Sequence, residues 1–181
     1  MRIAAVALAL SCLAATASAE TPPAGAAGKP GSPADEVLAA YNEAARKIVA
    51  MAEDYPEAKY DFKPTPEVRS FAEQILHVAG GNAGFLEAAR TGKWKEEEPS
   101  RATYKTKAQI VALLKKSVAD NVAYIKQSGA TAPVKSPFAP KMMSAMAYWF
   151  DAVGHLGEHY GQLVFYYRLN KLVPPESRPK K

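Results

Sequence analysis

The stretch KMMSAMAYWFDAVGHLGEHYGQLVFYYRLN, residues 141–170, decides the fold of this chain. It is predicted to be one helix that begins after Pro140 and ends near Asn170, because Pro174 and Pro175 prevent further helix. Its large apolar residues recur every three or four positions, the period of one helix face: Trp149, Leu156, Tyr160, Leu163 and Tyr167. A helix with one apolar stripe must bury it, so we expect other helices to pack against this one.

Three more segments show the same period and complete a set of four predicted helices. They cover about residues 33–51, 65–89 and 106–129. Thr65 as N-cap followed by Pro66 is a strong start signal for the second helix. Thr106 with Gln109 forms a capping box at the start of the third, and Gly129 closes it.

No stretch alternates with a convincing strand period, and the loops are confined to residues 54–64, 90–105 and 130–140. Four helices with apolar stripes pack most simply as a four-helix bundle. The 90–105 connection is long enough to cross the bundle, whereas a plain up-down-up-down order needs only short loops. The sequence therefore predicts an all-α four-helix bundle with one crossover connection, and the plain order stays open as the alternative.

The first residues indicate export. Arg2 precedes an apolar run from Ile3 to Leu13, and Ala17-Ser18-Ala19 matches the pattern that signal peptidase cuts after. The apolar run is too short to span a membrane, and the approach to Cys12 is a poor lipidation signal. We expect a signal peptide at residues 1–19, a disordered Pro/Gly/Ala-rich linker at 20–33, the bundle at 34–177 and a basic tail at 178–181. The protein would then be periplasmic or secreted, with no membrane span after cleavage.

Composition limits the chemistry that such a domain can perform. Cys12 is the only cysteine and leaves with the leader, so the mature chain has no thiolate for disulfides, catalysis or metal binding. A metal ion would have to be held by His, Asp or Glu. The net charge of +5 falls to +4 when Arg2 is removed, because the other charged residues lie beyond the cut. No basic stripe with interleaved aromatic residues is present, so no nucleic-acid partner is expected.

The three histidines of the chain are candidate metal ligands. His155 and His159 are four residues apart on one predicted helix, so both imidazoles lie on the same face. His77 lies midway along a different amphipathic helix, in line with Gly81 and Gly84. Three imidazoles would leave coordination positions open for water or substrate, as catalytic sites do. Zinc, nickel and ferrous iron all suit this ligand set.

Two segments resemble the DinB-like (DinB superfamily) metalloenzymes: FKPTPEVRSFAEQILHVAGGNAGFL at residues 62–86 and HLGEHYGQLVFYYRLNKLVPPES at residues 155–177. The second is the more specific, since the family's last helix often has a histidine, then EHYGQL, an arginine and a double proline. The resemblance implies a four-helix bundle in which His77, His155 and His159 bind one divalent metal. Lys171 departs from the pattern, because relatives commonly have a glycine there.

The resemblance also implies an enzyme, since relatives with assigned activities are thiol-dependent transferases, isomerases or hydrolases. We therefore expect a metal-dependent hydrolase or a thiol or group transferase acting on a small molecule. The alternative is a periplasmic metal- or ligand-binding bundle without turnover. The thiol cofactors are mainly cytoplasmic, which conflicts with an exported protein. The assembly state is left open between a monomer and a homodimer.

Two rival motifs and several possible assisting groups accompany the three histidines. His155 to His159 formally matches the inverted zinc-protease motif H-x-x-E-H, but only 22 residues follow His159, too few for that fold. No glutamate stands three residues before any histidine, which excludes a ferritin-like di-iron site. Glu158 is the candidate catalytic base, with a solvated carboxylate as the alternative. The candidates for orienting an imidazole are Glu73 and Asp151, and those for contacting a ligand are Gln162 and Tyr166.

Overall fold

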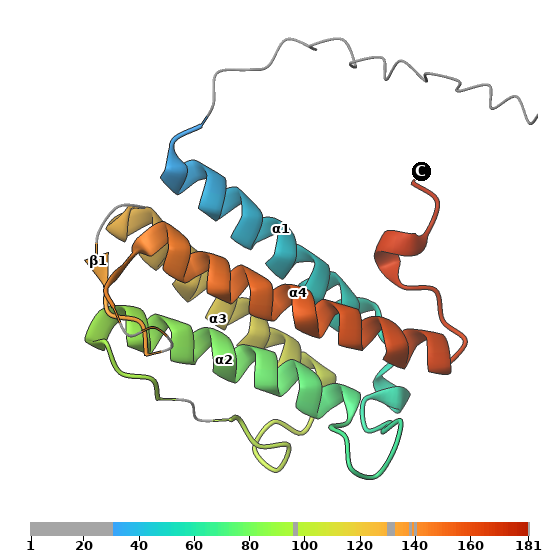
Figure 1. Ribbon diagram of the computed structural model, residues 1–181. Coiled ribbons are helices and arrows are strands. Elements are labelled where there is room, and N and C mark those ends of the chain that lie inside the picture. Colours follow the sequence, from blue (N-terminus) through green and yellow to red (C-terminus); the bar gives the residue numbers. More distant parts are fainter. Residues whose placement is uncertain (1–30, 96–97, 130–132, 138, 140, 181) are drawn as a thin grey trace, which may run out of the picture. The chain divides into compact units, whose positions relative to one another are not determined.

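The computed structural model describes residues 31–95, 98–129, 133–137, 139 and 141–180. The predicted signal peptide and nearly all of the linker lie outside this part of the chain. The described part forms a four-helix bundle (Figure 1), which confirms the predicted fold class. Its helices are α1 (Pro33–Asp54), α2 (Phe71–Thr91), α3 (Lys107–Ser128) and α4 (Ala145–Leu169), with short 3-10 turns η1 (Glu57–Lys59) and η2 (Pro175–Ser177). None of the helices in the described ranges is both long and apolar enough to cross a bilayer.

The predicted start of the second helix is wrong. Thr65 and Pro66 lie in a turn, and α2 begins at Phe71 with Ser70 as its N-cap. Ser70 and Glu73 form a reciprocal capping box, which satisfies two backbone amides at once and outweighs the proline signal. The capping box of Thr106 and Gln109 on α3 is present as predicted.

The fourth helix begins a few residues later than predicted. Residues 133–134 (β1) pair antiparallel with residues 143–144 (β2), and Ser144 then caps α4. A ladder of two residues is too short to show a period of two, so the sequence pattern did not predict it. At the other end, Lys171 has φ 59°, a left-handed conformation that favours glycine. The glycine expected there from the family resemblance would adopt this conformation without strain.

The helix directions establish a crossover topology and exclude the plain up-down-up-down order. The Tyr124 hydroxyl donates to the Ala89 carbonyl (3.1 Å), so α2 and α3 end side by side. Lys107 Nζ donates to the Tyr55 carbonyl (2.8 Å), so α3 starts where α1 ends. Helices α2 and α3 are thus parallel to each other and antiparallel to α1 and α4 (Figure 1).

The connection from α2 to α3 therefore returns along the length of α2. In its first part the Trp94 indole packs directly against Gly84 of α2. A Cβ atom on Gly84 would lie only 2.8 Å from Trp94 Cζ2. Further along, Glu98 forms an ion pair with Arg69 just before α2 begins (2.9 Å). The crossover connection thus covers the face of α2 that carries His77, and it supplies side chains to that face.

The apolar stripe predicted for α4 lies mostly in the core and thereby orients the face next to it. Four of its five residues are fully buried, and Tyr160 is only partly buried: Trp149, Leu156, Leu163 and Tyr167 have no exposed surface. Tyr167 also donates to the Met51 carbonyl of α1 (2.8 Å). With this stripe buried against α1, the face of α4 that carries His155 and His159 turns toward α2. Arg178, the first residue of the predicted basic tail, donates to Asp54 at the end of α1 (2.8 Å).

Candidate metal centre

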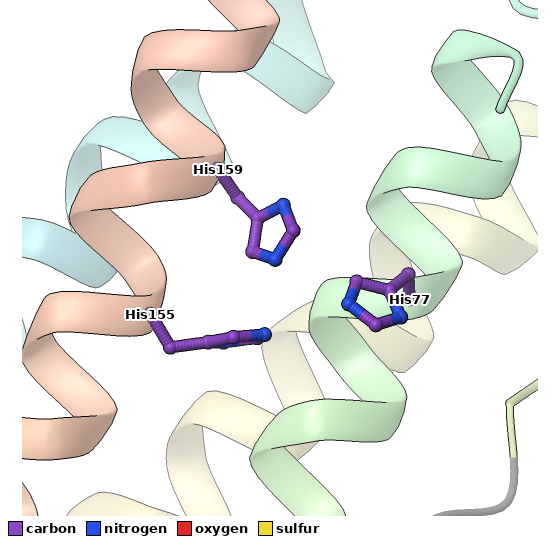
Figure 2. A group of neighbouring side chains, drawn as sticks. All are labelled: His77, His155 and His159. Carbon is purple, nitrogen blue, oxygen red and sulfur yellow. The ribbon is translucent and has the colours of Figure 1, made fainter. Parts of the chain in front are cut away.

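The structure brings the three histidines together between α2 and α4. His155 and His159 have ring centroids 4.4 Å apart, and His77 faces them from α2 at 5.6 Å and 4.8 Å. One nitrogen from each ring lies within 4.8 Å of the other two. Figure 2 shows the three rings pointing into the same space between the helices. The convergence expected from the sequence is therefore present.

Gly81 makes the close approach of His155 to α2 possible. A Cβ atom at this position would lie 2.6 Å from His155 Cε1 and 3.1 Å from its Nε2. Such distances are inside the van der Waals contact of carbon and nitrogen, so only a glycine leaves room for the ring as it stands. Gly81 follows His77 by four residues, about one helical turn, so both lie on the same face of α2. Helix α2 therefore supplies one ligand, His77, and the space at Gly81 (the notch) that the His155 ring occupies.

Burial keeps two of the imidazoles in the neutral form that binds metal ions. Desolvation lowers the pKa of His155 to about 4, and the neighbouring rings of His159 and His77 lower it further in the same direction. Desolvation also lowers the pKa of His159, with His77 as the second cause. His159 is only 5% exposed, and the His77 side chain is 16% exposed. Protons therefore compete little with a metal ion for His155 and His159 at neutral pH.

The Nδ1 atoms of two histidines face protein groups on the outer side of the cluster. Nδ1 of His77 lies 3.7 Å from the Glu98 carboxylate of the crossover connection. Nδ1 of His159 lies 2.6 Å from Gln74 Nε2 and 3.0 Å from Gln162 Oε1. Because Nδ1 of His159 contacts both glutamine side chains, its Nε2 is the nitrogen left for an ion. The 3.7 Å between Nδ1 of His77 and Glu98 is longer than a hydrogen bond. Outer partners of this kind orient metal-binding imidazoles.

The third ring lacks such a partner within the described residues. Nδ1 of His155 is buried and makes no hydrogen bond to any residue of the described ranges. The Phe85 ring, whose centroid lies 5.8 Å from that of His155, adds an apolar contact to this ring. His155 is thus held mainly by shape, through the notch at Gly81, whereas the other two rings have polar partners.

The residues present fit a divalent ion. Nitrogen atoms that share one zinc ion at about 2.0–2.1 Å lie roughly 3–4 Å apart. The ring nitrogens here lie within 4.8 Å, so small rotations of the side chains suffice to reach that spacing. Three neutral imidazoles are ligands that zinc, nickel and ferrous iron accept. The glycine notch explains how the third ligand reaches the cluster at all.

Several residues that the sequence placed near the site have other tasks. Glu73 closes the capping box of α2 and pairs with Lys63 (3.0 Å), and these contacts lower its pKa. Asp151 is exposed on α4. Tyr166 donates to the Arg69 carbonyl (2.6 Å) and does not pair with Gln162. Of the four assisting residues proposed beside Glu158, only Gln162 contacts a histidine.

Two functional neighbours were not found from the sequence. Gln74 is buried at 3% exposure and touches His159 from the first turn of α2. Its spacing of three residues from His77 was a usable signal, since such residues share a helix face. Glu98 lies in the connection between α2 and α3, outside any helix, so helical spacing cannot place it near His77. An acidic residue in a long loop gave no indication of its partner.

The comparisons with known proteins agree with this fold. A family model described as the DinB superfamily matches residues 40–163, which include all three histidines. Among curated proteins, none matches the sequence. The fold is similar to that of a DinB-like protein from Bacillus cereus, with a TM-score of 0.65, 14% identity and coverage of 78% of this chain and 95% of that chain.

A second DinB-like protein, YjoA from Bacillus subtilis, has a TM-score of 0.59 and 17% identity, over 76% of this chain and 94% of that chain. YfiT from Bacillus subtilis is described as a probable metal-dependent hydrolase with an unusual four-helix bundle topology. It has a TM-score of 0.60 and 12% identity, over 77% of this chain and 89% of that chain. At these identities the structural matches speak for the fold, and the family match covers most of the chain. The chain belongs to the DinB superfamily.

Proposed function

We propose that this protein is a metal-dependent hydrolase that acts on a small molecule outside the cytoplasm. The observation that supports it is the composition of the cluster, His77, His155 and His159. Among the described residues no fourth histidine, cysteine or carboxylate joins the group. A set of three protein ligands with open positions is the pattern of catalytic sites, whereas structural sites are closed by four.

The chain's own residues hold, orient and shield the ion. When bound, a divalent ion in such a site acts as a Lewis acid and lowers the pKa of water, which is the chemistry of hydrolysis. The three imidazoles supply its ligands, and Glu98, Gln74 and Gln162 orient two of the rings. The low pKa values of His155 and His159 keep these rings available at neutral pH.

Two cavities are lined by residues that lie next to the histidines, although no histidine lines either of them, and both are large enough for a small substrate. One of about 700 Å³ is lined by Gln74 and Gln162, which contact His159. Another of about 510 Å³ is lined by Glu98, which lies beside His77. Pockets for small molecules commonly have volumes of roughly 300–1,000 Å³. Val68 and Arg69 line both cavities, and Phe165 lines the larger one.

The proposal predicts that hydrolysis depends on the ion while the fold does not. Chelated protein should lose activity toward p-nitrophenyl acetate and acetyl-p-nitroanilide, and added zinc, nickel or ferrous iron should restore it. The melting temperature should change much less than for a site whose metal holds the fold together, because the core of α1 and α4 is built without the ion. Activity is measured by release of the chromophore, and folding by circular dichroism. Metal binding without turnover of either probe, combined with loss of the fold on chelation, would favour the alternative of a binding bundle.

Export is a separate part of the proposal and has its own test. The leader at residues 1–19 predicts that the mature protein begins at Glu20. Intact-mass measurement of protein isolated from its own host should show this amino terminus. Retention of Met1 in that protein would contradict both export and a periplasmic site of action.

A further inference from the structure

A chain of polar contacts leads from the surface of α4 to the ligand His159. The exposed carboxylate of Glu158 accepts a hydrogen bond from Gln162 Nε2 (3.2 Å). The other end of the same amide, Gln162 Oε1, lies 3.0 Å from His159 Nδ1. Gln74 Nε2 approaches the same His159 Nδ1 to 2.6 Å and donates to Gln162 Oε1. Two side chains, Gln74 and Gln162, thus meet at the nitrogen that does not face the cluster, and Glu158 reaches it through Gln162.

These contacts can support either neutral form of His159. If Nδ1 carries the proton, it donates to Gln162 Oε1 and leaves Nε2 free as a ligand. If Nδ1 is bare, it accepts from Gln74 Nε2, and the proton then sits on Nε2. In a neutral imidazole one nitrogen is the donor and the other the acceptor, so the two forms exclude each other. Only the first form presents a lone pair to an ion.

We propose that Glu158, acting through Gln162, is a positioning residue that commits His159 to the form with the proton on Nδ1. An ionised carboxylate can only accept hydrogen bonds. Glu158 therefore holds the amide nitrogen of Gln162 toward itself and turns the amide oxygen toward His159. That oxygen has two lone pairs, enough for both His159 Nδ1–H and the Gln74 amide. With the proton on Nδ1, the Gln74 amide nitrogen has to move from its 2.6 Å approach to that atom, because two donors then face each other.

In this role Glu158 orients the Gln162 amide and does not act as a catalytic base. If the Gln162 amide turned over, its nitrogen would face the Gln74 amide nitrogen, and its oxygen would face the Glu158 carboxylate. Both contacts would then join two donors or two acceptors, which is unfavourable. The Glu158 carboxylate can only accept hydrogen bonds, so it fixes the donor and acceptor ends of the Gln162 amide.

The inference rests on the proposed metal site, and four variants test it. Glu158→Gln keeps the shape but allows the Gln162 amide to turn. Gln162→Leu removes the contact with His159. The exchange Glu158→Gln with Gln162→Glu places a carboxylate directly on His159 Nδ1. Asp151→Asn is the matched control, because it removes an exposed carboxylate from the same helix without touching this chain of contacts.

Two readouts are needed: zinc affinity by competition with a chromogenic chelator, and the tautomer of His159 by ¹⁵N NMR of the metal-free protein. Gln162→Leu should weaken zinc binding by about 10- to 100-fold, as loss of an outer partner does. Glu158→Gln should weaken it by about tenfold or more, the effect of one hydrogen bond to a charged group. Both should shift metal-free His159 toward the form with the proton on Nε2. The exchange variant should bind zinc at least as tightly as the parent, and Asp151→Asn should match the parent.

The two proposals can fail separately. A parent protein that binds no zinc overturns the metal site, yet the NMR measurement still decides the tautomer of His159. If the parent binds zinc, but Glu158→Gln and Gln162→Leu leave both affinity and tautomer unchanged, the positioning role is overturned. Failure of the exchange variant to regain affinity, in a protein with unchanged circular dichroism, also contradicts it.

Discussion

Replacing His77 or His159 with alanine is expected to remove most of the bound divalent ion while leaving the helices intact. Each ring supplies one of three nitrogens that lie within 4.8 Å of one another. With only two ligands left on the protein, affinity should fall by more than about 100-fold, beyond the effect of losing an outer partner. The two positions lie on different helices, so equal losses in both variants would show that α2 and α4 share one ion.

The fold should tolerate these substitutions because the core lies elsewhere. The residues that hold α4 to α1 and α2 are large aromatic and aliphatic side chains with no measurable exposure, such as Trp149 and Leu156. The measurement is elemental analysis of protein purified without an affinity tag, together with circular dichroism. Asp151→Ala serves as the control, since this exposed residue is on α4 but outside the cluster. Negligible metal in the parent, or unchanged metal content in both histidine variants, would show that the site has been wrongly assigned.

The second large effect is expected from Gly81→Ala, a change that removes no ligand. The added methyl group would lie 2.6 Å from His155 Cε1, so the ring must leave its place. Metal affinity should drop by about 10- to 100-fold, as when the support of a ligand is removed. Stability need not fall with it, because alanine favours a helix over glycine by about 1 kcal/mol. A protein that is folded but binds metal weakly is therefore the expected result.

Gly154→Ala is the matched control for this test. It lies on α4 directly before His155, and a Cβ there would meet nothing within 4 Å. It should raise the free energy of unfolding by up to about 1 kcal/mol without changing metal affinity. Chelator competition measures the affinity, and urea unfolding measures the stability. Equal zinc affinity in Gly81→Ala and the parent would mean that the notch does not place His155.

A buried network of polar side chains joins α1, α2 and α3, and no sequence pattern predicted it. Asn82 of α2 donates to Ser117 of α3 (3.1 Å), and Asn121 of α3 donates to the Asn82 carbonyl (3.1 Å). The Tyr41 hydroxyl joins from α1, accepting from Asn121 and donating to Asn82. Buried polar groups need partners, so these hydrogen bonds favour one register of the three helices. Each of these residues alone resembles an ordinary polar position on a helix.

The sequence alone determined the features that depend on neighbouring residues. The apolar period of residues 141–170 indicated one helix with a buried stripe, and Trp149, Leu156 and Leu163 are buried as expected. The spacing of His155 and His159 placed both rings on one face, because four residues complete about one helical turn. The capping box at Thr106 located the start of α3, since all of its hydrogen bonds lie within four residues. Local geometry suffices for such features.

Only the tertiary structure decided which faces meet. The approach of His155 to Gly81 requires α4 to pack against α2, and nothing local to either helix specifies that pairing. Glu98 reaches His77 only because the connection between α2 and α3 runs back along the bundle. Gln74 and Gln162 are 88 residues apart and meet at His159 through the same packing. The sequence thus supplied the ligands, whereas the packing of the helices and the path of the crossover supplied the groups that orient them, because these contacts depend on how the buried stripes fit together.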